Sequence, residues 1–261
     1  LGIMQSGYPV VAESEDGEYS TYFPFLRCAA VGKYLPLCAV EKSAFRPARL
    51  IFGHLHSIMG FQKSGEVPVP PLSIMIKPAS GLCNLHCSYC FYADESANRE
   101  RASYGIMSVE SLEQIIKRVL AHAEGNCTIA FQGGEPTLAG LDFFRKVMEL
   151  QRKWNINHVK ISNAIQTNGI LIAREWASFF REYNFLVSIS LDGNRRVHDA
   201  NRLDDSGNGS FDRVIKSMDL LKEYGVEFNV LSVVTRQTVS QVRNIYQFFS
   251  RAGAEYQQYI S

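Results

Sequence analysis

Three cysteines within eight residues constrain this chain more than any other feature of its sequence. Cys83, Cys87 and Cys90 are spaced C-x3-C-x2-C, soon after the apolar run 73–77. Thiolates this close in sequence can converge on one soft metal centre when a loop carries them, because loop backbone is not tied into a sheet. The next cysteine, Cys127, belongs to a different predicted element. Structural zinc usually takes four ligands in paired C-x2-C spacing, so the motif favours an iron–sulfur cube with one iron left open for a small molecule.

Aromatic residues follow the third cysteine at once, at Phe91 and Tyr92. The alternative interpretation is that the three cysteines are buried structural residues. The C-x3-C-x2-C spacing followed by an aromatic pair fits that interpretation poorly. Further blocks accompany the motif, at residues 71–73 (PLS), 76–80 (IKPAS), 131–140 (FQGGEPTLAG), 166–169 (QTNG) and 191–193 (LDG). With these blocks the sequence resembles the radical S-adenosylmethionine (SAM) enzymes, and more narrowly the anaerobic sulfatase-maturating enzymes. The resemblance covers about residues 70–261 and does not reach residues 1–58.

The resemblance implies two cofactors, a [4Fe–4S] cluster and SAM. Cys83, Cys87 and Cys90 match the cluster ligands, and the open iron is expected to chelate SAM through its amino and carboxylate groups. Ser190 offers a hydroxyl, and Arg202 offers a fork-shaped cation suited to a carboxylate. The residues that the resemblance places on SAM are Tyr89, Gly133, Gly134, Glu135, Ser190 and Arg202, with Arg195 and Arg196 as competitors of Arg202.

The resemblance also implies the reaction and its partners. One electron would cleave SAM to a 5′-deoxyadenosyl radical, which would start the oxidation of a Cys or Ser in a sulfatase polypeptide to formylglycine. Tyr92, Gln132 and Gln166 are candidates for holding the substrate peptide. The electron would come from a low-potential donor of the flavodoxin or ferredoxin type. Two alternatives stay open, a related peptide-modifying enzyme that forms thioethers or crosslinks, and a fragment that only binds a cluster.

The sequence departs from this family after Ser261. The relatives carry a C-terminal, cysteine-rich region of the SPASM type, which holds two auxiliary [4Fe–4S] clusters and an aspartate that accepts the substrate proton. We therefore expect no catalytic proton acceptor within residues 1–261, and auxiliary clusters only in a full-length form. We also expect this segment alone to make no formylglycine.

Strand-like and helical runs alternate from residue 72 onward, which predicts an α/β fold with a parallel sheet. The predicted strands are 73–77, 127–132, 159–165, 185–190, 227–234 and 255–260, and the predicted helices are 108–123, 141–154, 174–183, 210–224 and 239–251. Right-handed crossovers would curl these units into a partial (β/α)6 barrel, as the resemblance also implies. Each motif then lies at the carboxyl end of a strand, where β/α enzymes gather their active residues.

Serines and glycines mark the ends of several predicted helices. Ser108 and Ser210 stand at plausible N-caps, and Gly125 and Gly225 follow helix ends. Cys127 is expected to be a small core residue, and His86 and His198 are expected at the surface. Asp192 could act as a general base, but Asp-Gly after a strand is more often a turn.

Residues 1–69 are organised differently, and we expect a weakly ordered N-terminal extension with a proline-rich linker before a core barrel at 70–261. Neither helical nor strand periodicity persists there. The chain begins at Leu1, and Met59 stands just before the family-like region, so we expect natural translation to begin near Met59.

Composition excludes several classes of partner. The net charge of +1 gives no electrostatic reason to bind nucleic acid or anionic lipid. No apolar run approaches the roughly 18 residues that a membrane helix needs, and the N-terminus does not resemble a signal peptide. Because the clustered cysteines are useless when oxidised, a reducing cytoplasm is the expected compartment.

Overall fold

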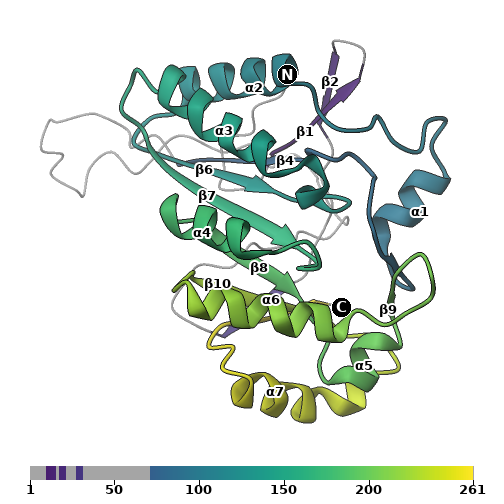
Figure 1. The fold of residues 1–261 in the computed structure, drawn as a ribbon. Coiled ribbons are helices and arrows are strands. Elements are labelled where there is room, and N and C mark those ends of the chain that lie inside the picture. The colour runs from purple at the N-terminus through teal and green to yellow at the C-terminus, as the bar shows by residue number, and fades with distance from the viewer. Residues whose placement is uncertain (1–9, 16–17, 22–27, 32–70, 261) are drawn as a thin grey trace, which may run out of the picture.

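A computed structural model of the chain describes residues 10–15, 18–21, 28–31 and 71–260 (Figure 1). Six parallel strands form the centre of one sheet, in the order of the chain. They are β4 (Leu72–Ile76), β6 (Asn126–Phe131), β7 (Lys160–Thr167), β8 (Leu186–Ser190), β10 (Phe228–Val233) and β11 (Gln257–Ile260). Each strand pairs with the next and β4 does not pair with β11, so the barrel is partial and the predicted fold class is confirmed.

Helices connect the strands, and Figure 1 shows α3, α4 and α6 side by side in front of the sheet. The connecting helices are α2 (Val109–His122), α3 (Leu141–Trp154), α4 (Arg174–Glu182), α6 (Phe211–Glu223) and α7 (Val242–Arg251), which the 3-10 turn η2 (Val239–Gln241) precedes. In α2 the apolar residues Leu112, Ile115, Ile116 and Leu120 share one buried face, and Ser108 caps the helix by accepting a hydrogen bond from the backbone N–H of Ser111. None of the helices within the described residues is long and apolar enough to cross a membrane.

An aromatic cluster between the helices and the sheet forms the centre of the core. The rings of Phe131 and Phe144 meet edge to face with centroids 5.1 Å apart, and Phe144 meets Trp176 in the same way at 5.3 Å. Side chains alternate along each strand, so Cys127, Ile129 and Phe131 of β6 are all buried in this core. Cys127 is thus the core residue that was predicted. The alternate residues of β6, Asn126, Thr128 and Ala130, lie on its other face and are exposed or half-buried.

Three short strands of the N-terminal extension lie at the two edges of this sheet. β1 (Val10–Glu15) runs parallel to β4 and pairs with β2 (Glu18–Thr21), and β3 (Cys28–Val31) runs antiparallel to β11. The remainder of the extension, including Met59 and the proline-rich linker, lies outside the described residues.

Small elements gather beyond the carboxyl ends of the strands, where Figure 1 shows α1, α5 and β9 together. They are β5 (His86–Cys87), α1 (Phe91–Ala97), the 3-10 turn η1 (Pro136–Ala139), α5 (Arg195–Asp199) and β9 (Arg202–Leu203). β5 and β9 form an antiparallel ladder separate from the main sheet. The sequence did not predict these elements, and they build most of the candidate site.

Candidate active site

The loop that carries the three cysteines is held in place by a segment more than a hundred residues further along the chain. His86 pairs with Leu203 and Cys87 with Arg202 in the β5–β9 ladder. Beyond the ladder, the backbone N–H of Ser88 donates to the carbonyl of Asn201 at 3.0 Å. His86 is exposed, as predicted, and its Nε2 lies 2.7 Å from a carboxylate oxygen of Asp205. These contacts fix the middle of the loop without using any thiol.

Cys83, Cys87 and Cys90 are free and half-buried. Burial raises the pKa of the Cys83 thiol to about 12. Burial also raises the pKa of Cys87, although the nearby Arg202 opposes this shift. Without a metal these two groups are therefore thiols at neutral pH, and metal binding has to displace their protons.

The donor set fits an iron–sulfur cluster better than a single ion. Among the described residues, no three Cys, His, Asp or Glu side chains are close enough together to hold one metal ion. A cluster spreads its ligands more widely, because each thiolate binds a different iron. An all-sulfur set of three free thiols on one anchored loop suits the soft iron of such a cluster.

Two glycines after β6 let this turn press against its neighbours. Both have left-handed backbone, with φ of +108° at Gly133 and +54° at Gly134. A Cβ at Gly134 would overlap the carbonyl oxygen of Leu82, the residue before the first cysteine, and a Cβ at Gly133 would lie 2.7 Å from Cγ of Lys77. The turn and the cysteine loop are thus in backbone contact, and the N–H of Glu135 donates to Leu82 at 2.7 Å.

The carboxylate of Glu135 joins two of the strand-end loops. It is buried and accepts four hydrogen bonds, from the backbone N–H and hydroxyl of Thr137, the hydroxyl of Thr167 and the backbone N–H of Asn168. Burial raises its pKa, and these donors partly offset that shift. The sequence assigned Glu135 to cofactor binding, whereas all four of these donors come from the chain itself.

Arg202 and Asp192 form a buried ion pair. Nε of Arg202 donates to Oδ2 of Asp192 at 3.0 Å, and Nη2 donates to Oδ1 at 3.1 Å. The hydroxyl of Tyr89 donates to the same carboxylate, as does the backbone N–H of Val233 at 3.1 Å. Burial by itself lowers the pKa of Arg202, but Asp192, together with Tyr89 and Cys87, acts in the other direction and the net shift is upward. The fork that was expected to face a ligand carboxylate therefore has two nitrogens occupied, while Nη1 lies 3.9 Å from Sγ of Cys87.

The competing arginines do not face this region. Arg195 forms an exposed two-point pair with Asp212, and Arg196 donates to the side chain of Gln241 at 3.0 Å. Both are therefore held at the surface by partners of their own.

His198 is not at the surface, and that expectation was wrong. Its side chain is fully buried on α5, and burial, aided by Arg202, lowers its pKa to about 3. Nδ1 lies 3.3 Å from the backbone N–H of Asp192 and must accept there, so Nε2 carries the proton and donates to the hydroxyl of Ser210 at 2.9 Å. Ser210 then donates to the carbonyl of Arg202, and its side chain does not cap α6 as predicted.

The remaining candidates are Gln166 and Ser190 at the ends of β7 and β8, Tyr92 on α1, and Gln132 directly after β6. Gln166 donates to the hydroxyl of Ser190 at 2.9 Å across β7 and β8. Tyr92 has its ring 5.0 Å from the ammonium group of Lys77. Gln132 follows β6 and is half-buried. Lys77 is buried beside Tyr92 but was not among the predicted site residues, although a charged residue directly after an apolar strand could have indicated it.

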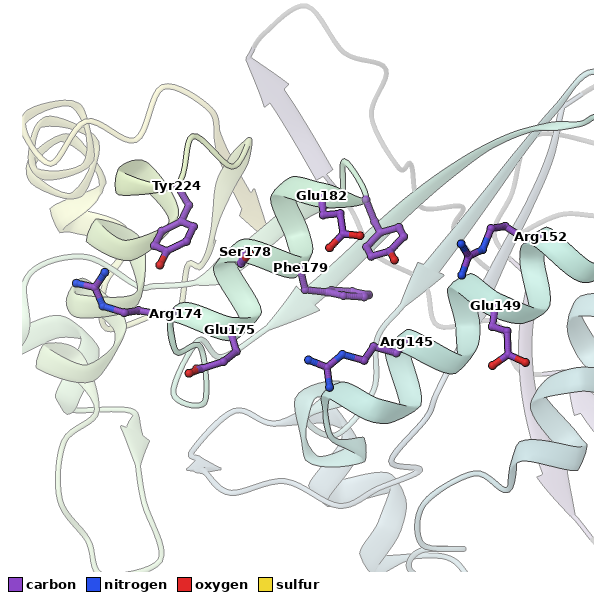
Figure 2. Close-up of a pocket in the computed structure, with 10 residues that line it drawn as sticks. Arg145, Glu149, Arg152, Arg174, Glu175, Ser178, Phe179, Glu182 and Tyr224 are labelled. Atoms are coloured by element: carbon purple, nitrogen blue, oxygen red, sulfur yellow. The ribbon is translucent and has the colours of Figure 1, made fainter.

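A cavity of about 630 Å³ on the outside of the barrel is unrelated to these motifs. Figure 2 shows it along α3 and α4, with one wall from the end of α6. Its charged lining residues are Arg145, Glu149, Arg152, Arg174, Glu175 and Glu182. None of the cysteines, glycines or polar residues discussed above lines it, so it is not the active site.

Comparisons with known proteins show the family of this chain. The profile of the radical SAM superfamily matches residues 78–249. A cysteine-type anaerobic sulfatase-maturating enzyme of Clostridium perfringens is 52% identical over 193 residues, which are 74% of this chain and 52% of that protein. A serine-type enzyme of Bacteroides thetaiotaomicron is 37% identical over 190 residues, 72% of this chain and 46% of that protein.

A solved structure of a sulfatase-maturating enzyme is also similar to this chain. Native anSMEcpe with bound AdoMet and the Cp18Cys peptide is 50% identical, with a TM-score of 0.67 over 72% of this chain and 50% of that one. The chain thus spans about half the length of the curated relatives it matches. A [4Fe–4S] cluster and SAM are its cofactors, and the chain belongs to the radical SAM superfamily.

Proposed function

We propose that the protein containing this chain oxidises a Cys or Ser of a sulfatase polypeptide to formylglycine. The observation that carries the proposal is the 52% identity to a cysteine-type anaerobic sulfatase-maturating enzyme over 193 residues. The identity to a serine-type relative is lower, 37%, and this difference favours cysteine as the target.

Cys83, Cys87 and Cys90 would hold the cluster, because they form an all-thiol set on one anchored loop. When bound, the cluster and SAM supply a 5′-deoxyadenosyl radical after one-electron reduction. The turn at 133–134 would bind SAM through its backbone, because its two glycines let it lie against Lys77 and Leu82, directly beside the cysteine loop. Glu135 would hold this turn against β7 from beneath.

Three further residues would line the SAM site. Ser190 keeps an oxygen near the end of β8, next to the amide of Gln166. Tyr89 and Arg202 would mainly pack against SAM, since the hydrogen bonds that both donate to Asp192 hold their side chains in place. A carboxylate of SAM could still reach Arg202 through Nη1, which is not used in the pair with Asp192.

Tyr92, Gln132 and Gln166 would contact the substrate peptide. Tyr92 comes from α1, Gln132 from the residue after β6 and Gln166 from the end of β7, and their amide and hydroxyl groups suit the backbone of an extended peptide. A solved relative carries a Cys-containing peptide together with AdoMet, which supports a peptide substrate here.

The remaining partners follow from the chemistry. A flavodoxin- or ferredoxin-type protein would deliver the electron, and two auxiliary clusters would belong to a full-length form. Cys83, Cys87, Cys90 and Cys127 are free thiols, which supports a reducing compartment such as the cytoplasm.

Deuterium transfer tests this proposal directly. The anaerobically reconstituted protein would receive SAM, dithionite and a sulfatase peptide whose target cysteine carries deuterium on its β-carbon. We expect deuterium in the 5′-deoxyadenosine, as measured by mass spectrometry, and none with a matched peptide that has Ala at the target. Unlabelled 5′-deoxyadenosine from both the Cys peptide and its Ser counterpart would contradict the proposal.

A further inference from the structure

In two of the cluster cysteines, a side-chain N–H donor lies close to the sulfur atom. Nδ2 of Asn168 lies 3.9 Å from Sγ of Cys83, and Nη1 of Arg202 lies 3.9 Å from Sγ of Cys87. Sulfur is larger than oxygen and accepts hydrogen bonds at longer distances, and both contacts lie near the outer end of that range. Arg202 is already committed to Asp192, whereas the amide of Asn168 has no such charged partner.

The orientation of the Asn168 amide is fixed by its neighbours. Its oxygen accepts from the backbone N–H of Ile170 at 3.0 Å, so the NH2 group must point the other way. One hydrogen of this group goes to Oδ1 of Asn84 at 2.7 Å. The second hydrogen is then available to the sulfur of Cys83.

The backbone of Asn168 is equally well held. Its N–H donates to Oε2 of the buried Glu135 at 2.7 Å, and the residue is 7% exposed. A donor held this rigidly needs no reorganisation to serve the sulfur. Its effect on nearby charge is large because little water screens it.

A donor aimed at a cluster sulfur changes how easily the cluster is reduced. Reduction adds negative charge that the thiolate sulfurs share, and a hydrogen bond stabilises the more negative form. Loss of the donor should therefore make reduction harder. This effect acts on the electron transfer that starts the reaction, before any substrate is involved.

The geometry points to Asn168 as a positioning residue that raises the reduction potential of the cluster through the sulfur of Cys83. This role depends on the cluster site and not on the sulfatase substrate. It can fail while the proposed function holds, and the reverse is equally possible.

The test is an anaerobic redox titration of the reconstituted protein, without SAM or peptide, that follows the EPR signal of the reduced cluster. Asn168→Ser keeps a short acceptor for Ile170 but removes the amide donor. We expect its ratio of reduced to oxidised cluster at a fixed potential to fall about tenfold, which is about 59 mV for a one-electron couple. Asn168→Asp, which places a carboxylate oxygen where the NH2 group was, should lower the ratio further.

Asn84→Ala is the matched control. It removes the neighbouring amide but leaves Asn168 as a donor to the sulfur, so its ratio should stay within about twofold of the wild type, well below one tenfold step. Iron and sulfide content would be measured for every variant. If Asn168→Ser does not hold a cluster, the reduction potential of Asn168→Asp is the measurement that tests the proposal.

Three outcomes would overturn the proposal. The first is an unchanged potential in Asn168→Ser and Asn168→Asp with full clusters. The second is an equal fall in Asn84→Ala, which would make the effect a general property of the loop. The third is loss of the cluster from both Asn168 variants but not from Asn84→Ala, which would make Asn168 necessary for assembly instead.

Discussion

Arg202 and Asp192 face each other in a two-point ion pair in which the two side chains are 7% and 0% exposed. The same carboxylate also accepts hydrogen bonds from Tyr89 in the cysteine loop and from Val233 at the end of β10. One buried charge therefore ties the cluster loop to the ends of β8, β9 and β10.

Removal of this carboxylate should destabilise the protein strongly. Asp192→Ala leaves the charge of Arg202 buried without a partner, and we expect the free energy of unfolding to fall by about 3–5 kcal/mol. Urea denaturation of the cluster-free protein measures it. Asp212→Ala breaks the exposed pair with Arg195 and is the control, with no measurable change expected. Equal effects in the two variants would show that Asp192 is not a structural anchor.

Alanine at Gly134 should disturb the cysteine loop, whereas alanine at Gly140 should not. Both glycines have positive φ, +54° and +83°, so each substitution costs about 1–3 kcal/mol of backbone strain. Only the Cβ at Gly134 meets another atom, the carbonyl oxygen of Leu82. We expect Gly134→Ala to bind less iron and sulfide on reconstitution and to bind SAM more weakly. Similar iron content and SAM affinity in both variants would count against this contact.

The buried His198 should make stability depend on pH. Unfolded, it binds a proton below its ordinary pKa of 6.5, but folded it does so only below about 3. Within this window the unfolded state binds more protons, so the free energy of unfolding falls as the pH falls, by up to about 1.4 kcal/mol per pH unit.

His198→Gln is the variant that isolates this effect. Its amide can repeat both hydrogen bonds of the imidazole but does not titrate. We expect the pH profiles of the two proteins, measured by urea denaturation, to separate below pH 6.5. Profiles that stay parallel down to the acid limit of the native state would refute the buried neutral histidine.

Cys127 should react more slowly than Cys83, Cys87 and Cys90. It is 1% exposed, so a reagent reaches its thiol only after local opening, and access sets the order because burial raises the pKa of Cys83 to about 12 and that of Cys127 to about 11. In the cluster-free protein at mildly alkaline pH, iodoacetamide should label the half-exposed Cys83, Cys87 and Cys90 before Cys127. Peptide mass spectrometry over time gives the order. Early labelling of Cys127 without unfolding would show that β6 is not packed as described.

The regular part of the fold could be predicted because it depends on local periodicity. The helix predicted at 141–154 matches α3, and all six core strands were placed within about two residues, which is within the usual uncertainty of element ends. The helix predicted at 239–251 begins as a 3-10 turn, a difference that apolar periodicity does not report.

The irregular part of the site depends on contacts between distant residues, and periodicity carries no trace of them. β5 and β9 are two residues each and exist only because they pair with one another. The burial of His198 could not be predicted, because a helix of five residues is too short to show an apolar periodicity. Nothing in the sequence shows that Arg202 forms an ion pair with Asp192 on the other side of this helix. The residue types at the site were therefore predictable, but their partners were not.

We expect the three thiols of the cysteine loop to hold a cluster that cleaves SAM. The most direct test is anaerobic reconstitution with iron and sulfide, addition of SAM and dithionite, and measurement of 5′-deoxyadenosine. We expect product from the wild type and from the control Cys127→Ala, and none when Cys83, Cys87 and Cys90 are changed to Ala. Product from the triple variant, or a fully loaded wild-type cluster that leaves SAM intact, would contradict the claim.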